Sequence, residues 1–398
     1  MQSNRNTVLN VKVNICILGI FVCLLVSPRI CDAQSIKVAT FNTSLFRSGP
    51  GELIRELATG ESKSAQKVAE ILQTVRPDLI LLNEFDFDRE GKAVELFKTK
   101  YLAVGQNGKK ALRFDYSFAP PVNTGVPSGL DLDNDGKSDG PGDAFGFGKY
   151  SGQYGFVVLS RFPIDEKQTR TFQKFLWKDM PEAMLPVNAD QTGFYSKAEL
   201  DVFRLSSKNH CDVVVRTDQG ELHFLVSHPT PPVFDGEEDR NGRRNHDEIR
   251  FWNDYVTPAK GKYIYDDRGT RGGMANKARF VVAGDLNADP KDGDSTNNPI
   301  GLFQRNDLFN FEIKPKSRGA VSAAQKGTAN KKHQGDPAMD TADFNDNTVG
   351  NLRIDYVLPS ANLKTTGAGV FWPTKDQPGF DLVGVSDHRL VWIEVRMR

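Results

Sequence analysis

The sequence predicts an α/β fold, because short apolar runs typical of buried strands alternate with helical and polar segments. Residues 36–42 are expected to be a strand, and residues 64–76 place apolar side chains at helical spacing until Pro77 stops the helix. Residues 78–85 follow as a continuous apolar strand. This strand–helix–strand order, with a hydrophobic content of 38%, is typical of an α/β domain with a sizeable core.

Further apolar runs along the chain are also expected to be strands, and they lie at residues 155–161, 212–217, 221–228, 279–287, 353–358 and 390–395. Most are apolar nearly throughout, which is typical of strands buried on both faces. Polar stretches at 105–151 and 318–350 are expected to be long surface loops. Residues 34–398 are therefore expected to form one large domain.

The N-terminal segment resembles a secretory signal peptide. Basic residues precede an apolar run at 13–26, which is shorter than the roughly 20 apolar residues that a membrane span needs. Small residues up to Ala33 form a cleavage pattern, so residues 1–33 are expected to be a signal peptide and the mature protein to be secreted or periplasmic. An uncleaved N-terminal anchor is the alternative. Cleavage would leave Cys211 as the only cysteine, which excludes an intrachain disulfide.

The formal net charge is zero, with 51 basic and 51 acidic residues. Proteins that track a long polyanion usually carry a strongly basic face. The composition therefore does not favour nucleic acid as a partner, although it leaves room for a local basic patch. No membrane span is expected in the mature chain, and we expect a monomer.

Polar side chains able to bind metal or phosphate follow or begin many of the apolar runs. They are Asn42, Glu84, His228, Asp285, Asn287, Asp355, Asp387 and His388. In open α/β folds, ligands bind where strand ends converge. Each residue alone is equally compatible with a turn or a helix cap, but together they indicate a functional site.

The motifs TFN, NEFD, LSRFP, VSH, GDLNADP, IDYVLP and VSDH occur in this order from about residue 36 onward. With them the chain resembles the endonuclease/exonuclease/phosphatase superfamily, whose members include deoxyribonuclease I, abasic-site endonucleases, sphingomyelinases and inositol polyphosphate phosphatases. GDLN followed by SDH is the most specific part. The resemblance implies a deoxyribonuclease I-like two-sheet α/β sandwich flanked by helices, and a secreted bacterial enzyme that hydrolyses phosphate esters with a divalent metal.

The resemblance also implies a role for each of these residues. Asn42, Glu84 and Asp387 would hold Mg²⁺ or Mn²⁺, hard cations that prefer oxygen ligands. The catalytic roles would be Asp285 for the attacking water, His228, Asn287 and His388 for the phosphoryl group, and Asp355 for orienting His388. Such donors stabilise the charge that grows on the phosphoryl oxygens in the transition state.

A second metal site is expected in an acidic loop. Asp131, Asp133, Asp135 and Asp139 place carboxylates at alternate or near-alternate positions, and Gly136 would permit the sharp turn of a calcium loop. The bidentate Glu of such a loop is missing at the twelfth position. A solvated acidic loop without Ca²⁺ is the alternative.

Four residues are candidates for binding the substrate. Tyr154 and Arg161 flank a predicted strand, where Arg161 could equally end a surface strand. Arg243 and Arg244 follow the His228 segment and could pair with a phosphate or carboxylate. Just beyond them, Asn245 is expected to be the N-cap of a helix, with Glu248 completing a capping box.

These features favour hydrolysis of a small organophosphate or phosphodiester outside the cytoplasm. An extracellular endonuclease or exonuclease acting on DNA or RNA is the alternative within the same chemistry. A non-catalytic, Ca²⁺-stabilised binding protein on the same fold is the alternative from another class. A two-carboxylate glycosidase fits the paired imidazoles poorly.

Overall fold

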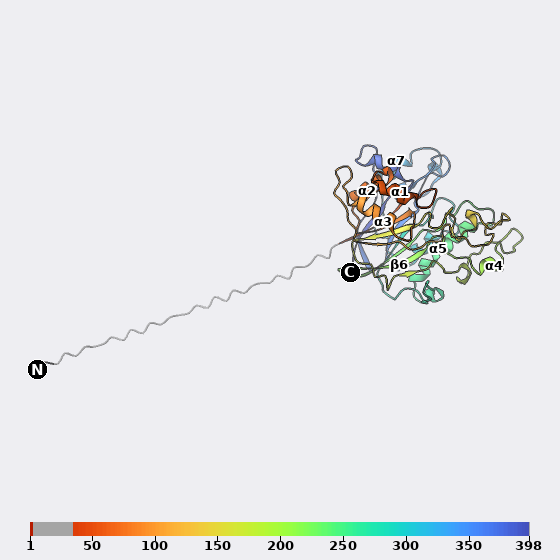
Figure 1. Ribbon diagram of the computed structural model, residues 1–398, viewed down its shortest axis with the longest axis horizontal. Coiled ribbons are helices and arrows are strands. Elements are labelled where there is room, and N and C mark those ends of the chain that lie inside the picture. The colour runs from red at the N-terminus through yellow and green to blue at the C-terminus, as the bar shows by residue number, and fades with distance from the viewer. Residues whose placement is uncertain (3–34, 398) are drawn as a thin grey trace. The chain divides into compact units, whose positions relative to one another are not determined.

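Two mixed β-sheets form the centre of the computed structural model, which describes residues 1–2 and 35–397 (Figure 1). The predicted signal peptide therefore lies outside the described residues, apart from its first two. Among the described residues, no helix is both long and apolar enough to cross a membrane.

The first sheet has six strands, in the order β12-β13-β1-β2-β4-β3. Their bounds are β12 Leu363–Val370, β13 Val391–Met397, β1 Ile36–Leu45, β2 Leu79–Phe85, β4 Phe156–Ser160 and β3 Tyr116–Phe118. β1 and β2 are parallel, and β13 pairs antiparallel with β1. The parallel pair requires a crossover, which the helical segment between the two strands supplies.

The second sheet has five strands, in the order β11-β8-β7-β6-β5. Their bounds are β11 Asp355–Pro359, β8 Phe280–Asp285, β7 Gly220–Ser227, β6 His210–Thr217 and β5 Arg170–Thr171. β7 and β8 are parallel, whereas β11 runs antiparallel to β8. A small pair, β9 (Ala342–Asp343) and β10 (Asn351–Leu352), lies outside both sheets.

Alternate side chains of the central strands enter different cores, as the two-residue period of a strand dictates. In β2, Leu79 and Leu81 pack between the two sheets with Phe224 of β7. Ile80 and Leu82 point to the other face and pack against the N-terminal helices. The strands are therefore buried on both faces, which explains why their sequences are apolar nearly throughout. The predicted two-sheet α/β sandwich is confirmed.

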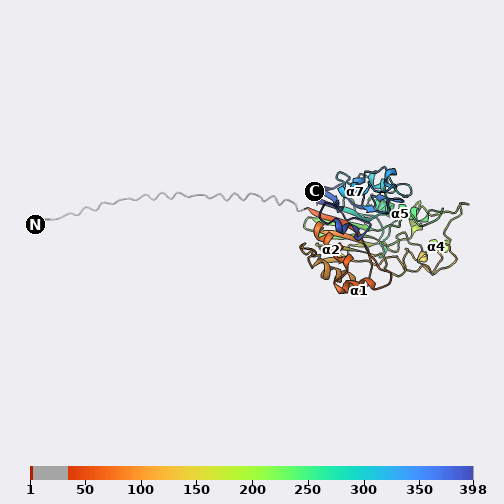
Figure 2. The same ribbon diagram turned by 90° about the horizontal axis from the view of Figure 1, so that it is seen from above.

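Helices cover the outer face of each sheet. The outer face of the first sheet is covered by α1 (Glu52–Thr59), α2 (Lys63–Val75) and α3 (Lys92–Phe97), the last of which continues as a π-helical turn at Lys98–Leu102. The outer face of the second sheet is covered by the long α5 (Arg240–Val256). In Figure 2, α1 lies at the lower edge of the described domain, whereas α5 lies in its upper half.

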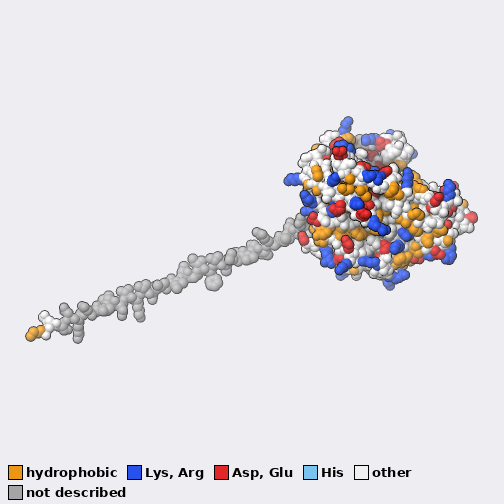
Figure 3. Space-filling view, in the orientation of Figure 1, with side chains coloured by type: hydrophobic (Ala, Val, Ile, Leu, Met, Phe, Trp, Pro, Cys, Tyr) orange, Lys and Arg blue, Asp and Glu red, His pale blue; other side chains and the backbone are white. Residues whose placement is uncertain are grey.

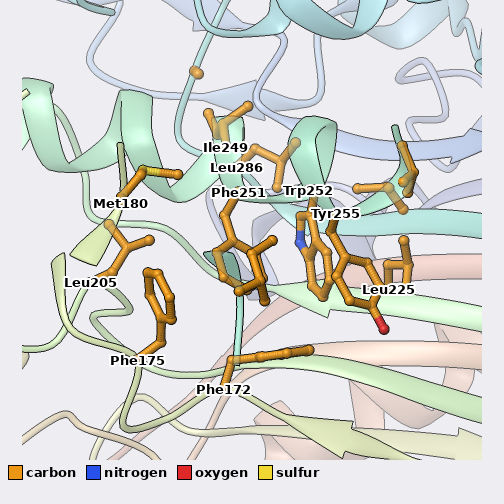
Figure 4. Packing of buried hydrophobic residues seen from close by; sticks show 14 of the residues in the cluster. Phe172, Phe175, Met180, Leu205, Leu225, Ile249, Phe251, Trp252, Tyr255 and Leu286 are labelled. Carbon is orange, nitrogen blue, oxygen red and sulfur yellow. The ribbon is translucent and has the colours of Figure 1, made fainter. Parts of the chain in front are cut away.

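The core under α5 is rich in aromatic side chains. Phe251, Trp252 and Tyr255 of α5 pack against Phe172 and Phe175, with ring centroids between Phe172 and Phe251 5.1 Å apart (Figure 4). Edge-to-face contacts of this kind stabilise a core beyond the area that they bury. This core fixes α5 against the second sheet.

The expected cap at Asn245 is wrong. Asn245 lies inside α5 and is fully buried, and the helix begins after Asp239. The expectation failed because Asn245 and Glu248 have buried tertiary partners, which a capping pattern cannot reveal.

The two expected long loops contain short elements of their own. Residues 105–151 include β3, and residues 318–350 include α7 (Arg318–Ala323) and β9. Two other short helices are α4 (Lys197–Leu200) and α6 (Ile300–Gln304). The edge strand β12 was also not predicted, because its sequence LKTTGAGV lacks a strong apolar run.

Candidate active site

Six strand ends meet at one edge of the sandwich. The C-terminal ends of β1, β2, β7 and β8 lie there because β1 is parallel to β2 and β7 to β8. The N-terminal ends of β11 and β13 lie there because each runs antiparallel to its neighbour, and Asp355 pairs directly with Asp285. The polar residues predicted from the sequence therefore lie together at this edge, although they belong to both sheets.

Asp285, at the end of β8, is the centre of this site and is 1% exposed. Its Oδ2 accepts a hydrogen bond from Asn42 Nδ2 at 3.0 Å, and this bond joins the two sheets. The same oxygen lies 3.3 Å from His228 Nε2 and 3.6 Å from His388 Nε2. Asp285 Oδ1 accepts the backbone N–H of Asn287 at 3.0 Å. One carboxylate thus faces three side-chain nitrogens.

These neighbours decide the charge of Asp285. Burial raises its pKa, but His388, His228 and Asn42 together outweigh burial and hold the pKa well below the usual value of an aspartate. Asp285 is therefore a carboxylate at neutral pH.

A hydrogen-bonded chain orients His388. Its Nδ1 lies 2.9 Å from Asp355 Oδ2, which also accepts the hydroxyl of Thr341 at 2.9 Å. Burial lowers the pKa of His388, but Asp355 and Asp285 outweigh burial and raise it to about 10. Burial in turn raises the pKa of Asp355 to about 6. His388 is therefore a cation at neutral pH, with Nε2 directed into the site.

His228, unlike His388, has a lowered pKa. It is 3% exposed, and its Nδ1 has no hydrogen-bond partner among the described residues. Burial, with the positive charge of Lys208, lowers its pKa below the usual value. His228 is therefore neutral at neutral pH, and it can donate from Nε2 toward Asp285.

Glu84, at the end of β2, fits the requirement for a metal ligand. Its carboxylate has no hydrogen bond or ion pair among the described residues, yet its charge acts on Tyr154, Lys208 and His228. Glu84 also adopts a positive φ of 55°, which is uncommon for a non-glycine residue. Asn42 is on the adjacent strand, paired with Asn83.

Asp387 is the third predicted metal ligand. It is exposed, and its Oδ1 lies 4.0 Å from His388 Nε2. The donor set at this edge, an unpaired carboxylate with an amide and an exposed carboxylate nearby, suits a hard divalent cation. Asp285, Asp355 and His388 also have atoms within 4.8 Å of one another. Hydrogen bonds already use these atoms, and the positive charge of His388 disfavours a metal ion among them.

Gly284 is the glycine of the GDLN motif, and the packing of the strands explains why this position requires glycine. A Cβ at this position would lie 2.1 Å from the carbonyl oxygen of Ser227, so only glycine lets β7 and β8 approach so closely beside His228 and Asp285. Asn287 follows with a positive φ of 51°, and its side-chain amide donates to the carbonyl of Pro229 at 3.2 Å. The motif thus sets the turn that carries Asn287.

Lys208 belongs to the site and was not predicted. It is 6% exposed, and Nζ lies 3.5 Å from the carbonyl oxygen of Pro229. Burial lowers its pKa, while Glu248, Glu84 and Asp285 oppose that shift. The sequence shows only that Lys208 lies just before an apolar run. The antiparallel pairing of β6 with β7, which ends one residue before His228, places the start of β6 at the active edge.

Two buried side chains of α5 hold the site from behind. Glu248 accepts the backbone N–H of Ser207 at 2.7 Å and that of Thr230 at 2.6 Å. Asn245 Nδ2 donates to the carbonyls of Thr230 at 2.8 Å and Leu286 at 2.9 Å. α5 therefore fixes the segments that carry Lys208, His228 and Asn287.

Tyr154 lies near Glu84, because the N–H of Phe85 donates to the carbonyl of Gly155 at 2.9 Å. Burial and the charge of Glu84 raise the pKa of Tyr154. Its ring packs on Phe46 with centroids 4.6 Å apart, and its backbone N–H donates to Asp86 at 3.1 Å. Asp86 also accepts the hydroxyl of Tyr150 at 2.6 Å. Tyr154 therefore forms one wall at the Glu84 side of the site.

The expectations for Arg161 and Arg244 are wrong. Arg161 lies at the opposite edge from Glu84, because β4 runs antiparallel to β2, and it forms an ion pair with Asp78 at 2.8 Å. The buried guanidinium of Arg244 donates to the carbonyls of Leu205, Phe145 and Arg204. Arg243 is 30% exposed at its side chain, so its substrate role stays a prediction.

The acidic loop gathers a different set of carboxylates from the one expected. Asp131, Asp133 and Asp143 have oxygens within 4.8 Å of one another. Asp135 instead accepts the backbone N–H of Lys137, and Asp139 is exposed. Asp143 joins the group because it folds back to accept the N–H of Leu132 at 2.9 Å.

Comparison with known proteins gives the following matches. A sequence model described as the Endonuclease/Exonuclease/phosphatase family matches residues 39–388. No curated protein matches the chain.

Solved structures resemble the chain at low sequence identity. An endonuclease/exonuclease/phosphatase from Beutenbergia cavernae is 16% identical, with 92% of this chain and 72% of that chain covered and a TM-score of 0.49. A family protein from Bacteroides thetaiotaomicron is 13% identical, with coverage of 92% and 99% and a TM-score of 0.47. Sphingomyelinase C from Streptomyces griseocarneus is 17% identical, with coverage of 91% and 99% and a TM-score of 0.43.

Proposed function

Because the chain belongs to the endonuclease/exonuclease/phosphatase family, we propose that this metal-dependent phosphoric ester hydrolase acts on a small organophosphate or phosphodiester outside the cytoplasm. The observation that carries the proposal is the carboxylate of Asp285, which faces Asn42, His228 and His388 beside the unpaired Glu84. A buried carboxylate among hydrogen-bond donors suits the activation of water next to a phosphoryl group.

In this mechanism Asp285 orients the attacking water and accepts its proton. Its low pKa in the free site makes it a weak base. A bound phosphoryl group would draw the N–H groups of His228 and His388 toward its own oxygens, and losing those donors would raise the pKa of Asp285. Substrate binding would thus make Asp285 a stronger base only when the ester is in place.

The other residues bind the phosphoryl group. His388 donates as a cation and His228 as a neutral imidazole, and Lys208 adds a nearby positive charge when protonated. Asp355 and Thr341 keep His388 in its working orientation. A divalent cation such as Mg²⁺ or Mn²⁺, held by Glu84 with Asn42 and Asp387, would neutralise charge on the non-bridging oxygens.

A small substrate agrees with the distribution of charge. The net charge is zero, and basic and acidic side chains are interspersed on the face shown in Figure 3. Binding to DNA or RNA depends on several Lys or Arg contacts with phosphates and weakens steeply with salt. Tyr154 and Arg243 would contact the part of the substrate beyond the phosphate.

A panel of metals and substrates tests this function. The chain is stripped of metal with a chelator and assayed with Mg²⁺, Mn²⁺ or Ca²⁺ on DNA, RNA, phospholipid, a phosphomonoester and a small phosphodiester. We expect no turnover without metal and the highest turnover on a small ester with Mg²⁺ or Mn²⁺. Salt-sensitive cleavage of plasmid DNA as the main activity would replace the small substrate by nucleic acid. A lack of turnover with every metal would favour a binding protein on the same fold.

The proposal includes export and a second cation. Residues 1–33 would direct the enzyme to the periplasm or the medium and then be removed, so sequencing the N-terminus of the secreted protein would read from Gln34. The carboxylates of Asp131, Asp133 and Asp143 would hold a structural Ca²⁺.

A further inference from the structure

Arg389 directly follows Asp387 and His388 in the sequence, and its side chain turns back toward their backbone. The residue is 4% exposed. Its Nη1 donates to the carbonyl of Ser386 at 2.7 Å and to that of His388 at 2.9 Å. One guanidinium nitrogen therefore binds the backbone on both sides of Asp387.

Two groups hold the guanidinium of Arg389 in this place. Its Nη2 donates to Asp343 Oδ2 at 3.1 Å, and its central carbon lies 4.4 Å from the centroid of the Trp372 ring. The ring face and the carboxylate both stabilise a guanidinium. Arginine suits this position because its five N–H donors point in fixed directions within one plane.

The short strand β9, which ends at Asp343, is bound to the same stretch of backbone. The N–H of Asp343 donates to the carbonyl of Asp387 at 2.8 Å, and the N–H of Arg389 donates to the carbonyl of Thr341 at 2.7 Å. Arg389 and β9 together therefore bind the three consecutive carbonyls of residues 386–388.

The segment around β9 also contacts the catalytic imidazole. Thr341 donates to Asp355, which orients His388. Phe344 packs edge-to-face on His388, with ring centroids 5.9 Å apart. The side chain of Asp387 is by contrast 51% exposed, so the direction of its carboxylate depends on the backbone that carries it.

A catalytic group must be held close to its productive geometry, and the partners that orient such groups contribute much of their effect. We propose that Arg389 is a positioning residue that fixes the backbone of Asp387 and His388 for the reaction. The inference rests on the proposed function, because Asp387 and His388 belong to that site. Arg389 acts through their carbonyls and is not itself a catalytic residue.

A largely buried arginine elsewhere in the chain gives a matched control. Arg170 of β5 also donates to two backbone carbonyls, each at 2.8 Å, and pairs with Asp266 at 2.9 Å. Its guanidinium lies over the ring of Phe172, 5.1 Å from the centroid. β5 is the outermost strand of the second sheet, three strands away from β8, which ends at Asp285. The two arginines therefore have the same kinds of partner, but only Arg389 binds the backbone of the site.

The experiment uses the full chain and measures both local order and turnover. Arg389→Met removes the donors of the side chain and keeps an apolar stem, and Arg170→Met does the same at the control position. Hydrogen exchange followed by mass spectrometry reports how well the amides of residues 386–389 are protected. Initial rates on a small phosphodiester with Mg²⁺ give kcat and KM, and thermal unfolding checks that each variant is folded.

Arg389→Met should exchange the amides of residues 386–389 at least about tenfold faster, because the segment opens locally without its donor. It should lower kcat by about 10–100-fold, the usual cost of removing a group that orients an active-site residue. KM should change by less than about threefold, because the groups that bind the substrate are still present. Arg170→Met should leave kcat and the exchange of this segment as in the unmodified protein, even where it lowers the unfolding midpoint equally.

Three results would overturn the positioning role: unchanged exchange of residues 386–389 in Arg389→Met, faster exchange with an unchanged kcat, or an equal fall of kcat in Arg170→Met. Should Arg389→Met fail to fold, Arg389→Lys takes its place with the same expected losses, because lysine keeps the charge but lacks the planar fork. A lack of turnover in the unmodified protein would instead contradict the proposed function. The exchange measurement would then still decide whether Arg389 fixes this segment.

Discussion

At the scale of single residues, the site depends on how burial and charge set three protonation states. Asp285 stays anionic because His388, His228 and Asn42 outweigh its burial. His388 stays cationic because Asp355 and Asp285 outweigh its burial, whereas His228 is neutral because burial is the largest influence on it. Two imidazoles beside the same carboxylate therefore differ in charge, a contrast typical of acid–base sites.

Asp285→Asn should lower kcat by roughly 10²–10⁴, the usual contribution of a general base. The amide has nearly the same shape as the carboxylate but cannot accept the proton of the water. Initial rates on a small phosphodiester with Mg²⁺ measure the effect, and thermal unfolding checks that the variant is folded. A folded variant whose kcat falls less than about threefold would remove Asp285 from the role of base.

Asp355→Asn should move the alkaline limb of the pH–rate profile to lower pH. Asp355 is a main cause of the raised pKa of His388, which is about 10 in the intact site against a usual 6.5. Without this carboxylate, His388 loses its proton at a lower pH, and activity falls earlier as the pH rises. Profiles of kcat for both proteins test the shift, and coincident alkaline limbs would contradict it.

The same pKa has a consequence for stability. Because the folded-state pKa of His388 is raised above its unfolded value, its stabilising effect is complete below about pH 6.5. That effect is lost as the pH rises through the folded value of about 10.

Residues that end apolar strands could be predicted from the sequence, and residues whose role depends on a partner strand could not. Asn42, Glu84 and Asp285 follow apolar runs and do lie at one edge. Arg161 has the same local pattern but lies at the opposite edge, because the direction of β4 is set by its pairing with β2. Lys208 was missed because it precedes its strand.

At the scale of secondary structure, α5 connects the aromatic core to the active site. One part of the helix packs Phe251 and Trp252 against the second sheet. Asn245 and Glu248 instead bind backbone groups of the catalytic loops. The helix was expected near its observed place, but its capping pattern was misleading because buried polar partners cannot be read from spacing.

Asn245→Ala should destabilise the protein by about 1–3 kcal/mol, the cost of leaving a buried polar group unsatisfied. It should also lower kcat, because the carbonyls of Thr230 and Leu286 lose the donor that holds their loops. Urea denaturation measures the free energy of unfolding. Arg243→Ala is the control for stability, since its pair with Asp239 at 4.0 Å is partly exposed and worth less than about 1 kcal/mol. Equal losses of unfolding free energy in the two variants would contradict the tethering role of Asn245.

At the scale of the whole molecule, the alternation of apolar strands with helices predicted an α/β domain, and the family resemblance implied its two sheets and flanking helices. The pairing order of the strands came only from the structure. The apolar runs of β1 and β8 do not reveal which neighbours they have, and edge strands such as β12 leave little trace in the sequence. The site lies between the sheets, so its geometry depends on their packing.

Phe224→Ala should cost about 3–5 kcal/mol of unfolding free energy, as expected for a large cavity in a well-packed core. Phe224 is fully buried between the sheets. Phe234→Ala is the matched control, because Phe234 is 88% exposed and its loss should change stability by less than about 0.5 kcal/mol. Urea unfolding curves for both variants test the difference, and similar midpoints would show that the sheet interface is not tightly packed.

The position of β13 between β12 and β1 affects how the chain reaches this structure. Ile36 pairs with Val395, so the first sheet joins residues that are far apart in the order of synthesis. Contacts between such distant segments form slowly, because a long loop must close before they are made. Until β13 docks, β1 presents unpaired backbone groups on an apolar strand, which is a template for aggregation. We therefore expect a chaperone to protect β1 of the nascent chain until β13 has been synthesised.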